Sequence, residues 1–337
     1  MNYILKNENA IFYECGYSND NSIFLSIDGD RYLFTDGRYK LEAKPKHTKV
    51  EIGSDIIELA INIIKQYKIK ELSFDPKEWC VYSFDRLTFK TDVKLKAIVD
   101  LSHKKRIIKT PKEIKKLKRA VVLGADAFDK FANYLLSNGD NQDEYKLNLK
   151  AKEILSYDGK YELSFEPIVA IGENSAKPHA MPTDRRLNKK DLILVDAGLK
   201  YQRYCSDRTR VAQFRDGMDF TLYQDFGKAK IQKIYDTVAK AHDMAIARTK
   251  SGMRAKDIDK IARDVIEKAG FGKYFVHSTG HGVGLDIHEM PYISSTSETI
   301  IEEGMVFTIE PGIYLPNKFG IRVEDMVVIK NGRADIL

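Results

Sequence analysis

Cysteine is scarce in this 337-residue sequence, and the three cysteines lie far apart without any CxxC spacing: Cys15, Cys80 and Cys205. That pattern supports neither a disulfide framework nor a zinc-thiolate site, so a reducing, cytoplasmic location is expected. No apolar run approaches the roughly 20 residues that a membrane-spanning helix needs. The first residues, MNYILKNENA, already include polar and acidic positions, so we expect no export signal.

A large excess of one charge is also lacking. The formal charge is +6, hydrophobic residues make up 43% and charged residues 31% of the chain, which is the composition of an ordinary folded protein. Much of the basic excess falls in residues 103–120. In this stretch and directly after it, Ile114, Leu117 and Val121 recur at helical spacing, and lysines fill the other faces. We interpret this stretch as a solvated helix surface, so neither nucleic acid nor a membrane is an expected partner.

Short strands and helices alternate in the first hundred residues. Residues 22–27 and 31–35 flank an Asp-Gly-Asp turn and predict a β-hairpin. Residues 55–67 then repeat apolar positions at helical spacing after a possible cap at Ser54 or Asp55. This part of the chain is predicted to be an α/β unit of its own.

A domain boundary is predicted just before Thr110. Thr110, followed by Pro111 at the first helical position and by Glu113, gives the pattern of a capped helix start. The predicted domains are therefore 1–106 and 107–337.

The second predicted domain alternates blocks of helices with pairs of strands. Helices are expected at 110–137, 141–157, 220–250 and 256–269, and strands at 165–171, 192–199, 204–214, 305–314 and 320–329. Because the strands come in antiparallel-looking pairs, this pattern predicts α+β layering and not a regular βαβ wheel.

Two aspartates stand in the segment LILVDAGLKYQRYCSDRTR. Asp196 ends a strongly apolar strand, where a lone carboxylate is costly unless it is paired or bound to a cation. A hairpin turning near residues 200–203 would bring Asp207 beside it. Two carboxylates that close repel one another unless a metal ion neutralises them. Each aspartate taken alone is equally well explained as a cap or turn residue.

Three of the seven histidines fall within residues 277–288, in HSTGHGVGLDIHE, together with three glycines that permit close backbone approach. The spacing is not the HExxH of a zincin helix, and no GK[ST] follows the glycines as in a phosphate loop. A single histidine here could be structural, but the cluster favours metal binding or acid–base chemistry.

Two glutamates complete the candidate set. Glu310 ends an apolar strand before Pro311, and Glu324 lies two positions after Arg322, which could pair with a carboxylate on its own strand face. One histidine and four carboxylates make an oxygen-rich ligand field that suits Mn, Co or Fe at least as well as Zn. One divalent ion would leave half of the four negative charges uncompensated. Two ions balance these charges and can generate a nucleophile at neutral pH.

At these motifs the sequence resembles the M24, or pita-bread, metallopeptidases, and within them the Xaa-Pro peptidases aminopeptidase P and prolidase. The resemblance spans the whole chain, with 1–106 similar to the family's creatinase-like N-terminal domain and 107–337 to its catalytic domain. It implies five metal ligands, each in its own motif: Asp196 in VDAG, Asp207 in SDRTR, His281 in STGHGVG, Glu310 in TIEPG and Glu324 in IRVED.

The resemblance also implies roles around the metals. Three histidines would line the substrate pocket and steady the tetrahedral intermediate: His179, His277 and His288. Glu310 would pass protons between the nucleophile and the leaving nitrogen, and Arg322 would orient the ligand carboxylates. The implied cofactors are two divalent ions per chain, Mn first and Co, Zn or Fe as alternatives. The implied assembly is a homodimer.

Tyr292 decides the predicted subtype. Many dipeptidase-type members carry an arginine at this position, four residues after the histidine that matches His288, where it can pair with a dipeptide's carboxylate. We therefore expect an Xaa-Pro aminopeptidase acting on longer proline-containing peptides. Xaa-Pro dipeptidase (prolidase) is the alternative, because an arginine of the first domain, such as Arg38 or Arg86, could replace the missing one. Methionine aminopeptidase and a non-catalytic peptide-binding relative fit less well, the former because it usually lacks a domain like 1–106 and the latter because no ligand is lost.

Overall fold

The computed structural model describes all residues, 1–337. The chain divides into two compact units, Met1–Arg106 and Ile107–Leu337. None of its helices combines the length and the apolar character that crossing a membrane requires.

The first unit is built on a six-stranded mixed sheet in the order β4-β3-β2-β1-β5-β6. Its elements follow the chain as β1 (Tyr3–Leu5), α1 (Glu8–Cys15), β2 (Ser22–Ile27), β3 (Asp30–Thr35), the 3₁₀ helix η1 (Gly37–Tyr39), β4 (Lys49–Ile52), α2 (Ile56–Tyr67), β5 (Glu71–Phe74), α3 (Val81–Lys90), β6 (Lys94–Ala97) and α4 (Leu101–Arg106). The predicted β2–β3 hairpin and the helix capped by Asp55 are both present.

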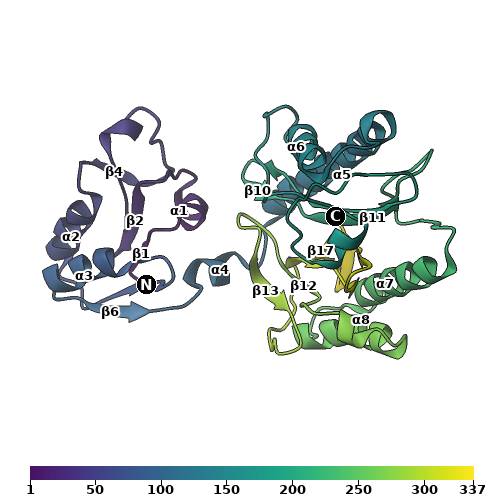
Figure 1. The fold of residues 1–337 in the computed structure, drawn as a ribbon. Coiled ribbons are helices and arrows are strands. Elements are labelled where there is room, and N and C mark those ends of the chain that lie inside the picture. Colours follow the sequence, from purple (N-terminus) through teal and green to yellow (C-terminus); the bar gives the residue numbers. More distant parts are fainter. The chain divides into compact units, whose positions relative to one another are not determined.

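Both faces of this sheet are covered by helices (Figure 1). Successive side chains of a strand point to opposite faces. Accordingly, Ile23 and Leu25 of β2 pack with α2 and α3, whereas Phe24 packs with α1 on the other side. A central strand that is buried on both faces reads as a continuous apolar run, as SIFLSI does here.

The second unit holds a three-stranded sheet (β11-β8-β7), a five-stranded sheet (β13-β12-β14-β17-β18) and two short hairpins (β9–β10 and β15–β16). Its elements are α5 (Pro111–Asn138), α6 (Glu144–Leu155), β7 (Ile168–Ile171), η2 (Gly172–Ala176), β8 (Leu192–Ala197), β9 (Lys200–Tyr201), β10 (Tyr204–Cys205), β11 (Arg208–Gln213), α7 (Ala229–Arg248), α8 (Ala255–Lys268), η3 (Gly272–Tyr274), β12 (Gly280–Gly282), β13 (Glu289–Ile293), β14 (Val306–Ile309), β15 (Gly312–Leu315), β16 (Phe319–Arg322), β17 (Asp325–Lys330) and β18 (Arg333–Ile336).

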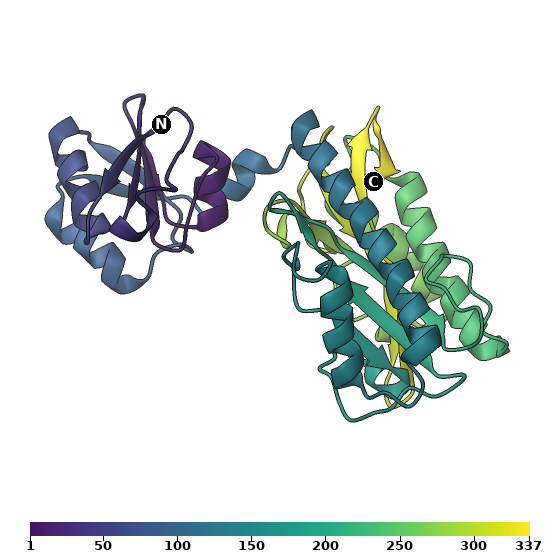
Figure 2. The same cartoon turned by 90° about the horizontal axis from the view of Figure 1, so that it is seen from above.

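Each large sheet of the second unit carries a helix pair. Helices α5 and α6 lie side by side over β7, β8 and β11, with Phe128, Phe131 and Leu147 in the shared core (Figure 2). Helices α7 and α8 pack against the strands of the C-terminal half, with Ile258 and Phe307 in that core. The predicted capping box at Thr110 is present and starts α5. This is the expected α+β arrangement.

Four predicted segments are wrong in detail. The continuous strands expected at 204–214, 305–314 and 320–329 are each interrupted, because the chain leaves one sheet and enters another at the interruption. At one of these points Pro311 has no N–H to give to a ladder. The helix expected from residue 220 begins only at Ala229, after Gly227, whose positive φ of 62° ends any earlier helical path.

Candidate metal centre

The two aspartates meet across an antiparallel pair of strands. Asp196 belongs to β8 and lies opposite Thr209 of β11, so Asp207, two residues before Thr209, is its diagonal neighbour. The predicted turn is present, with Gln202 and Arg203 both in the left-handed region between β9 and β10. The hairpin therefore brings the two carboxylates to one place, as the sequence predicts.

The other three candidate ligands come from the C-terminal sheet. His281 is the middle residue of β12, and Gly282 beside it pairs with Phe307 of β14. Glu310 follows β14 and Glu324 precedes β17, at the end of the ladder where these two strands pair. The three strand interruptions thus fall at members of the candidate set, so Asp207, Glu310 and Glu324 lie just outside the strands.

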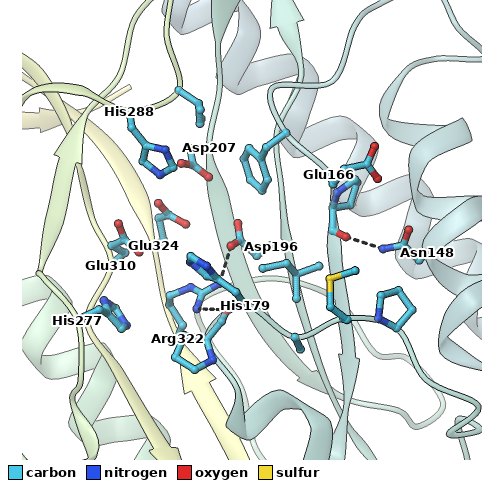
Figure 3. Close-up of a pocket in the computed structure, with 18 of the residues that line it drawn as sticks. Asn148, Glu166, His179, Asp196, Asp207, His277, His288, Glu310, Arg322 and Glu324 are labelled. Carbon is cyan, nitrogen blue, oxygen red and sulfur yellow. Dashed lines mark hydrogen bonds and ion pairs between the residues drawn. The ribbon is translucent and has the colours of Figure 1, made fainter. Parts of the chain in front are cut away.

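The side chains converge on one point. The His281 Nε2 atom lies 3.3 Å from Glu310 Oε1 and 3.6 Å from Asp207 Oδ2. One ligand atom each of Asp207, His281 and Glu324 lie within 4.8 Å of one another. Figure 3 shows the carboxylates of Asp196, Asp207, Glu310 and Glu324 facing the same space. All five predicted ligands are therefore brought together.

Because these carboxylates are removed from water, burial disfavours their charged forms. Burial, and after it the carboxylates of Glu324 and Asp196, raises the pKa of Asp207 well above its ordinary value. Burial raises the pKa of Glu310 to about 8. Burial, together with Glu310 and Asp196, also raises the pKa of Glu324 well above its ordinary value. Without a cation, Glu310 therefore holds a proton at neutral pH, and the pKa shifts of Asp207 and Glu324 go in the same direction.

The histidine is prepared as a neutral ligand. Burial, and after it the His288 imidazole, lowers the pKa of His281 to about 3. Its Nδ1 lies 3.1 Å from the carbonyl oxygen of Gly282, which fixes the proton on Nδ1 and leaves the Nε2 lone pair directed at Asp207 and Glu310. A neutral imidazole with a free Nε2 is the form that binds metals.

Arg322 is the buried cation of this centre. Its Nη2 donates to Asp196 Oδ2 at 2.5 Å, its Nη1 to the Tyr314 hydroxyl at 2.6 Å, and its Nε to Thr209 Oγ1 at 3.0 Å. The alternative pairing of Arg322 with Glu324, suggested by strand spacing, is wrong because the chain bends between them; Thr209 donates to Glu324 instead, at 2.6 Å.

The donor set fits divalent cations. Four carboxylates and one guanidinium leave a net charge of −3, and the second oxygen of Asp196 is buried without a hydrogen-bond donor, an arrangement that a cation would satisfy. Oxygen ligands with a single imidazole are those that Mn, Co or Fe accept as well as Zn. The residues present therefore suit the cofactors that the sequence predicts.

The three further histidines surround the same space from different segments (Figure 3). His277 Nε2 lies 2.9 Å from the Tyr314 hydroxyl, and burial, and after it Arg322, lowers the pKa of His277 to about 4. The ring of His288 lies 4.3 Å from that of His281. Burial, and after it the nearby His179, lowers the pKa of His288. All three imidazoles line the pocket.

A cavity of about 930 Å³ adjoins the centre, near the upper end of the roughly 300–1,000 Å³ of small-molecule sites. Tyr292 of β13 lines it and is 42% exposed. Part of the cavity wall is apolar, and it includes Pro167, next to the residue that pairs with Asp196. We call this part the apolar arm; it is lined by Tyr145, Leu149, Phe165, Pro167, Met181 and Pro182. At its rim Lys152 forms an ion pair with Glu166.

Three polar residues of the centre are absent from the sequence-based candidates. Thr209 and Tyr314 both accept hydrogen bonds from the Arg322 guanidinium. Thr308 Oγ1 donates to Glu310 Oε1 at 3.2 Å and accepts from the backbone N–H of His281 at 3.1 Å. Thr308 could have been noticed, since it lies two residues before Glu310 on one strand face. Nothing in the sequence marks Tyr314.

The comparisons with known proteins agree with this geometry. The model of metallopeptidase family M24 matches residues 115–331. The Xaa-Pro dipeptidase of Pyrococcus furiosus is 40% identical over 246 residues, which cover 73% of this chain and 67% of that protein. Among solved structures, an Xaa-Pro dipeptidase from Bacillus anthracis superposes with a TM-score of 0.90 at 28% identity over 99% of this chain and 92% of its own. An X-Pro aminopeptidase from Thermotoga maritima gives 0.87 at 31% identity over 99% and 94%.

Proposed function

Because this chain belongs to metallopeptidase family M24 and has its pita-bread fold, we propose that it is a metal-dependent Xaa-Pro dipeptidase, a prolidase. The observation that carries the proposal is the convergence of one neutral imidazole and four carboxylates, with a single guanidinium, on one cavity. Relatives named Xaa-Pro dipeptidase support this choice over the aminopeptidase expected from Tyr292.

We further propose that each chain binds two divalent ions, with Mn²⁺ as the favoured metal. Asp196, Asp207, His281, Glu310 and Glu324 would hold them. Bound there, the ions would supply the positive charge that polarises the carbonyl before proline and activates water. They would also offset the net charge of −3 that one divalent ion leaves partly uncompensated.

The chain's own groups supply positioning and proton transfer. Glu310 lies beside the metal space and can take a proton from the attacking water and deliver it to the proline nitrogen, which has no N–H and leaves poorly unless it is protonated. Neutral His277 and His288 can donate or accept hydrogen bonds at the developing oxyanion without bringing a competing charge. A free substrate amine would pair with the Asp196 carboxylate, whose second oxygen has no donor, and this pairing would favour removal of N-terminal residues.

The aminopeptidase alternative remains a specific second candidate, because Tyr292 supplies no positive charge for a dipeptide's carboxylate. Of the lysines and arginines lining the cavity, Arg322 is committed to Asp196, and Lys152 is paired with Glu166 at the rim. Comparing kcat/KM for an Xaa-Pro dipeptide and the matching Xaa-Pro-Yaa tripeptide separates the two. A dipeptide preference supports prolidase; a tripeptide preference assigns the enzyme to the aminopeptidases.

The proposed assembly is a homodimer. Sedimentation equilibrium of the intact chain is expected to give twice the monomer mass of 38.6 kDa. A single monomeric species at micromolar concentration would remove this part of the proposal without touching the peptidase assignment.

A further inference from the structure

A buried carboxylate outside the metal centre contacts the loop that carries one of the pocket histidines. Glu144 is the first residue of α6 and is fully buried, with 0% of its surface exposed. No lysine, arginine or histidine pairs with it. A buried carboxylate without a cation is costly unless hydrogen bonds satisfy it.

Four donors satisfy it. The backbone N–H of Ile171 donates to Glu144 Oε1 at 2.6 Å. The other oxygen, Oε2, accepts from Asn174 Nδ2 at 2.7 Å, from the backbone N–H of Thr183 at 2.8 Å and from Thr183 Oγ1 at 2.7 Å. Hydrogen bonds to a charged acceptor are about twice as strong as neutral ones. The four bonds therefore hold the three donor residues firmly to Glu144.

The donors belong to the two ends of a single loop. Ile171 closes β7 and Asn174 follows it, while Thr183 lies where the chain returns, and the residues between carry His179 toward the cavity. Asn174 Nδ2 also donates across the loop to the carbonyl of Met181 at 2.9 Å. One carboxylate therefore holds both ends of the loop 172–183 together.

The rest of the loop is tied to the metal-centre side. The backbone N–H of Gly320 donates to Ser175 Oγ at 2.8 Å, and Arg322 Nη1 donates to the carbonyl of Pro178, next to His179, at 3.2 Å. A Cβ at Gly320 would lie 2.0 Å from the Ser175 carbonyl oxygen, so this close approach requires glycine. These contacts hold the middle of the loop in place, and the hydrogen bonds to Glu144 hold its two ends together.

We propose that Glu144 is a positioning residue that holds His179 in place for the reaction by clamping the loop 172–183. This inference rests on the proposed peptidase function for its kinetic test. Glu144→Gln keeps the size of the side chain but cannot keep the clamp, because the amide nitrogen must face at least one of the N–H donors in either orientation. Misplacing a substrate-contacting group by about 1 Å costs up to about 100-fold in rate.

A double-mutant cycle with His179→Ala tests whether Glu144 acts through His179. We expect Glu144→Gln to lower kcat/KM about 10- to 100-fold in the otherwise native chain, and to change it less than about twofold in the His179→Ala background. The same loss in both backgrounds would overturn the inference. Thr183→Val, which removes one donor from the loop side, should reproduce a smaller part of the effect if Glu144→Gln fails to fold.

Glu113→Gln is the matched control. Glu113 is also a buried glutamate in the first turn of a helix, where it accepts from Thr110 and from the Tyr204 hydroxyl at 3.1 Å, and it does not contact the loop. Hydrogen exchange gives a readout that does not depend on activity: Glu144→Gln should raise exchange in 172–183, and Glu113→Gln should not. Unchanged exchange in the loop contradicts the clamp. Absence of Xaa-Pro cleavage by the native chain instead contradicts the proposed function and leaves the exchange result to decide the clamp.

Discussion

Binding of divalent ions to the metal-free protein should release protons at pH 7. Burial raises the pKa of Glu310 to about 8 and those of Asp207 and Glu324 above their ordinary values, whereas ligands bind metal only after losing their protons. A group with a pKa of about 8 is about 90% protonated at pH 7. Glu310 alone should therefore release about 0.9 proton, and Asp207 and Glu324, whose pKa values are also raised, should add to that number.

The histidine sharpens this expectation. His281, with its pKa lowered to about 3, is already neutral at pH 7 and releases nothing. Because binding competes with protons, the affinity for Mn²⁺ should rise with pH, by about tenfold per pH unit for each proton released. The Glu310 contribution should fall to about 0.1 proton at pH 9, above its pKa.

Calorimetric titration with Mn²⁺ in buffers of different ionisation enthalpy measures the number directly, as the slope of the observed heat against that enthalpy. Glu310→Gln should reduce the number at pH 7 by about 0.9. Saturable metal binding that releases no proton at pH 7 would refute the account of how the buried carboxylates are held.

Three further outcomes follow from the same structure. The metal-free fold should lose stability as the pH rises from about 5 through 8, because a buried acid whose folded pKa is raised stabilises the fold only while it is protonated; a melting temperature that climbs over that range contradicts this. Gly280→Ala should abolish metal binding or folding, because its Cβ would lie 1.9 Å from the Thr308 carbonyl oxygen. Native-like metal binding by this variant in calorimetry would contradict the close approach of β12 to β14. Leu-Pro should be cleaved with a kcat/KM about tenfold or more above that of Gly-Pro, since the apolar arm next to Asp196 can bury the first side chain. Leu149→Asp should remove this difference. Equal kcat/KM values for the two dipeptides in the native chain would contradict the proposed role of the apolar arm.

Most of the helices, and the carboxylates and histidine that converge at the candidate centre, can be predicted because each has a local signature in the sequence. The Thr110 capping box and the hairpin at 22–35 depend on neighbouring residues, and both are present. The strand interruptions at Asp207, Glu310 and Glu324 are not predictable in the same way, since the apolar pattern runs through them and only the change of sheet in three dimensions breaks the strands.

Long-range partners are equally hidden from the sequence. Strand spacing suggests Glu324 for Arg322, but the guanidinium reaches Asp196, 126 residues away. Glu144 has the ordinary pattern of an acid in the first turn of a helix, where the helix dipole favours it. Only the burial of its carboxylate and the return of the chain at Thr183 reveal its contacts with the His179 loop.

The most direct test of the central claim is a metal titration of chelator-treated protein, followed by hydrolysis of an Xaa-Pro dipeptide. We expect no hydrolysis without metal, full recovery at two Mn²⁺ ions per chain, and no recovery by Asp207→Ala, whereas the surface control Asp216→Asn, 93% exposed at its side chain, should behave as the native chain. Full hydrolysis after exhaustive metal removal, or by Asp207→Ala, would contradict the account.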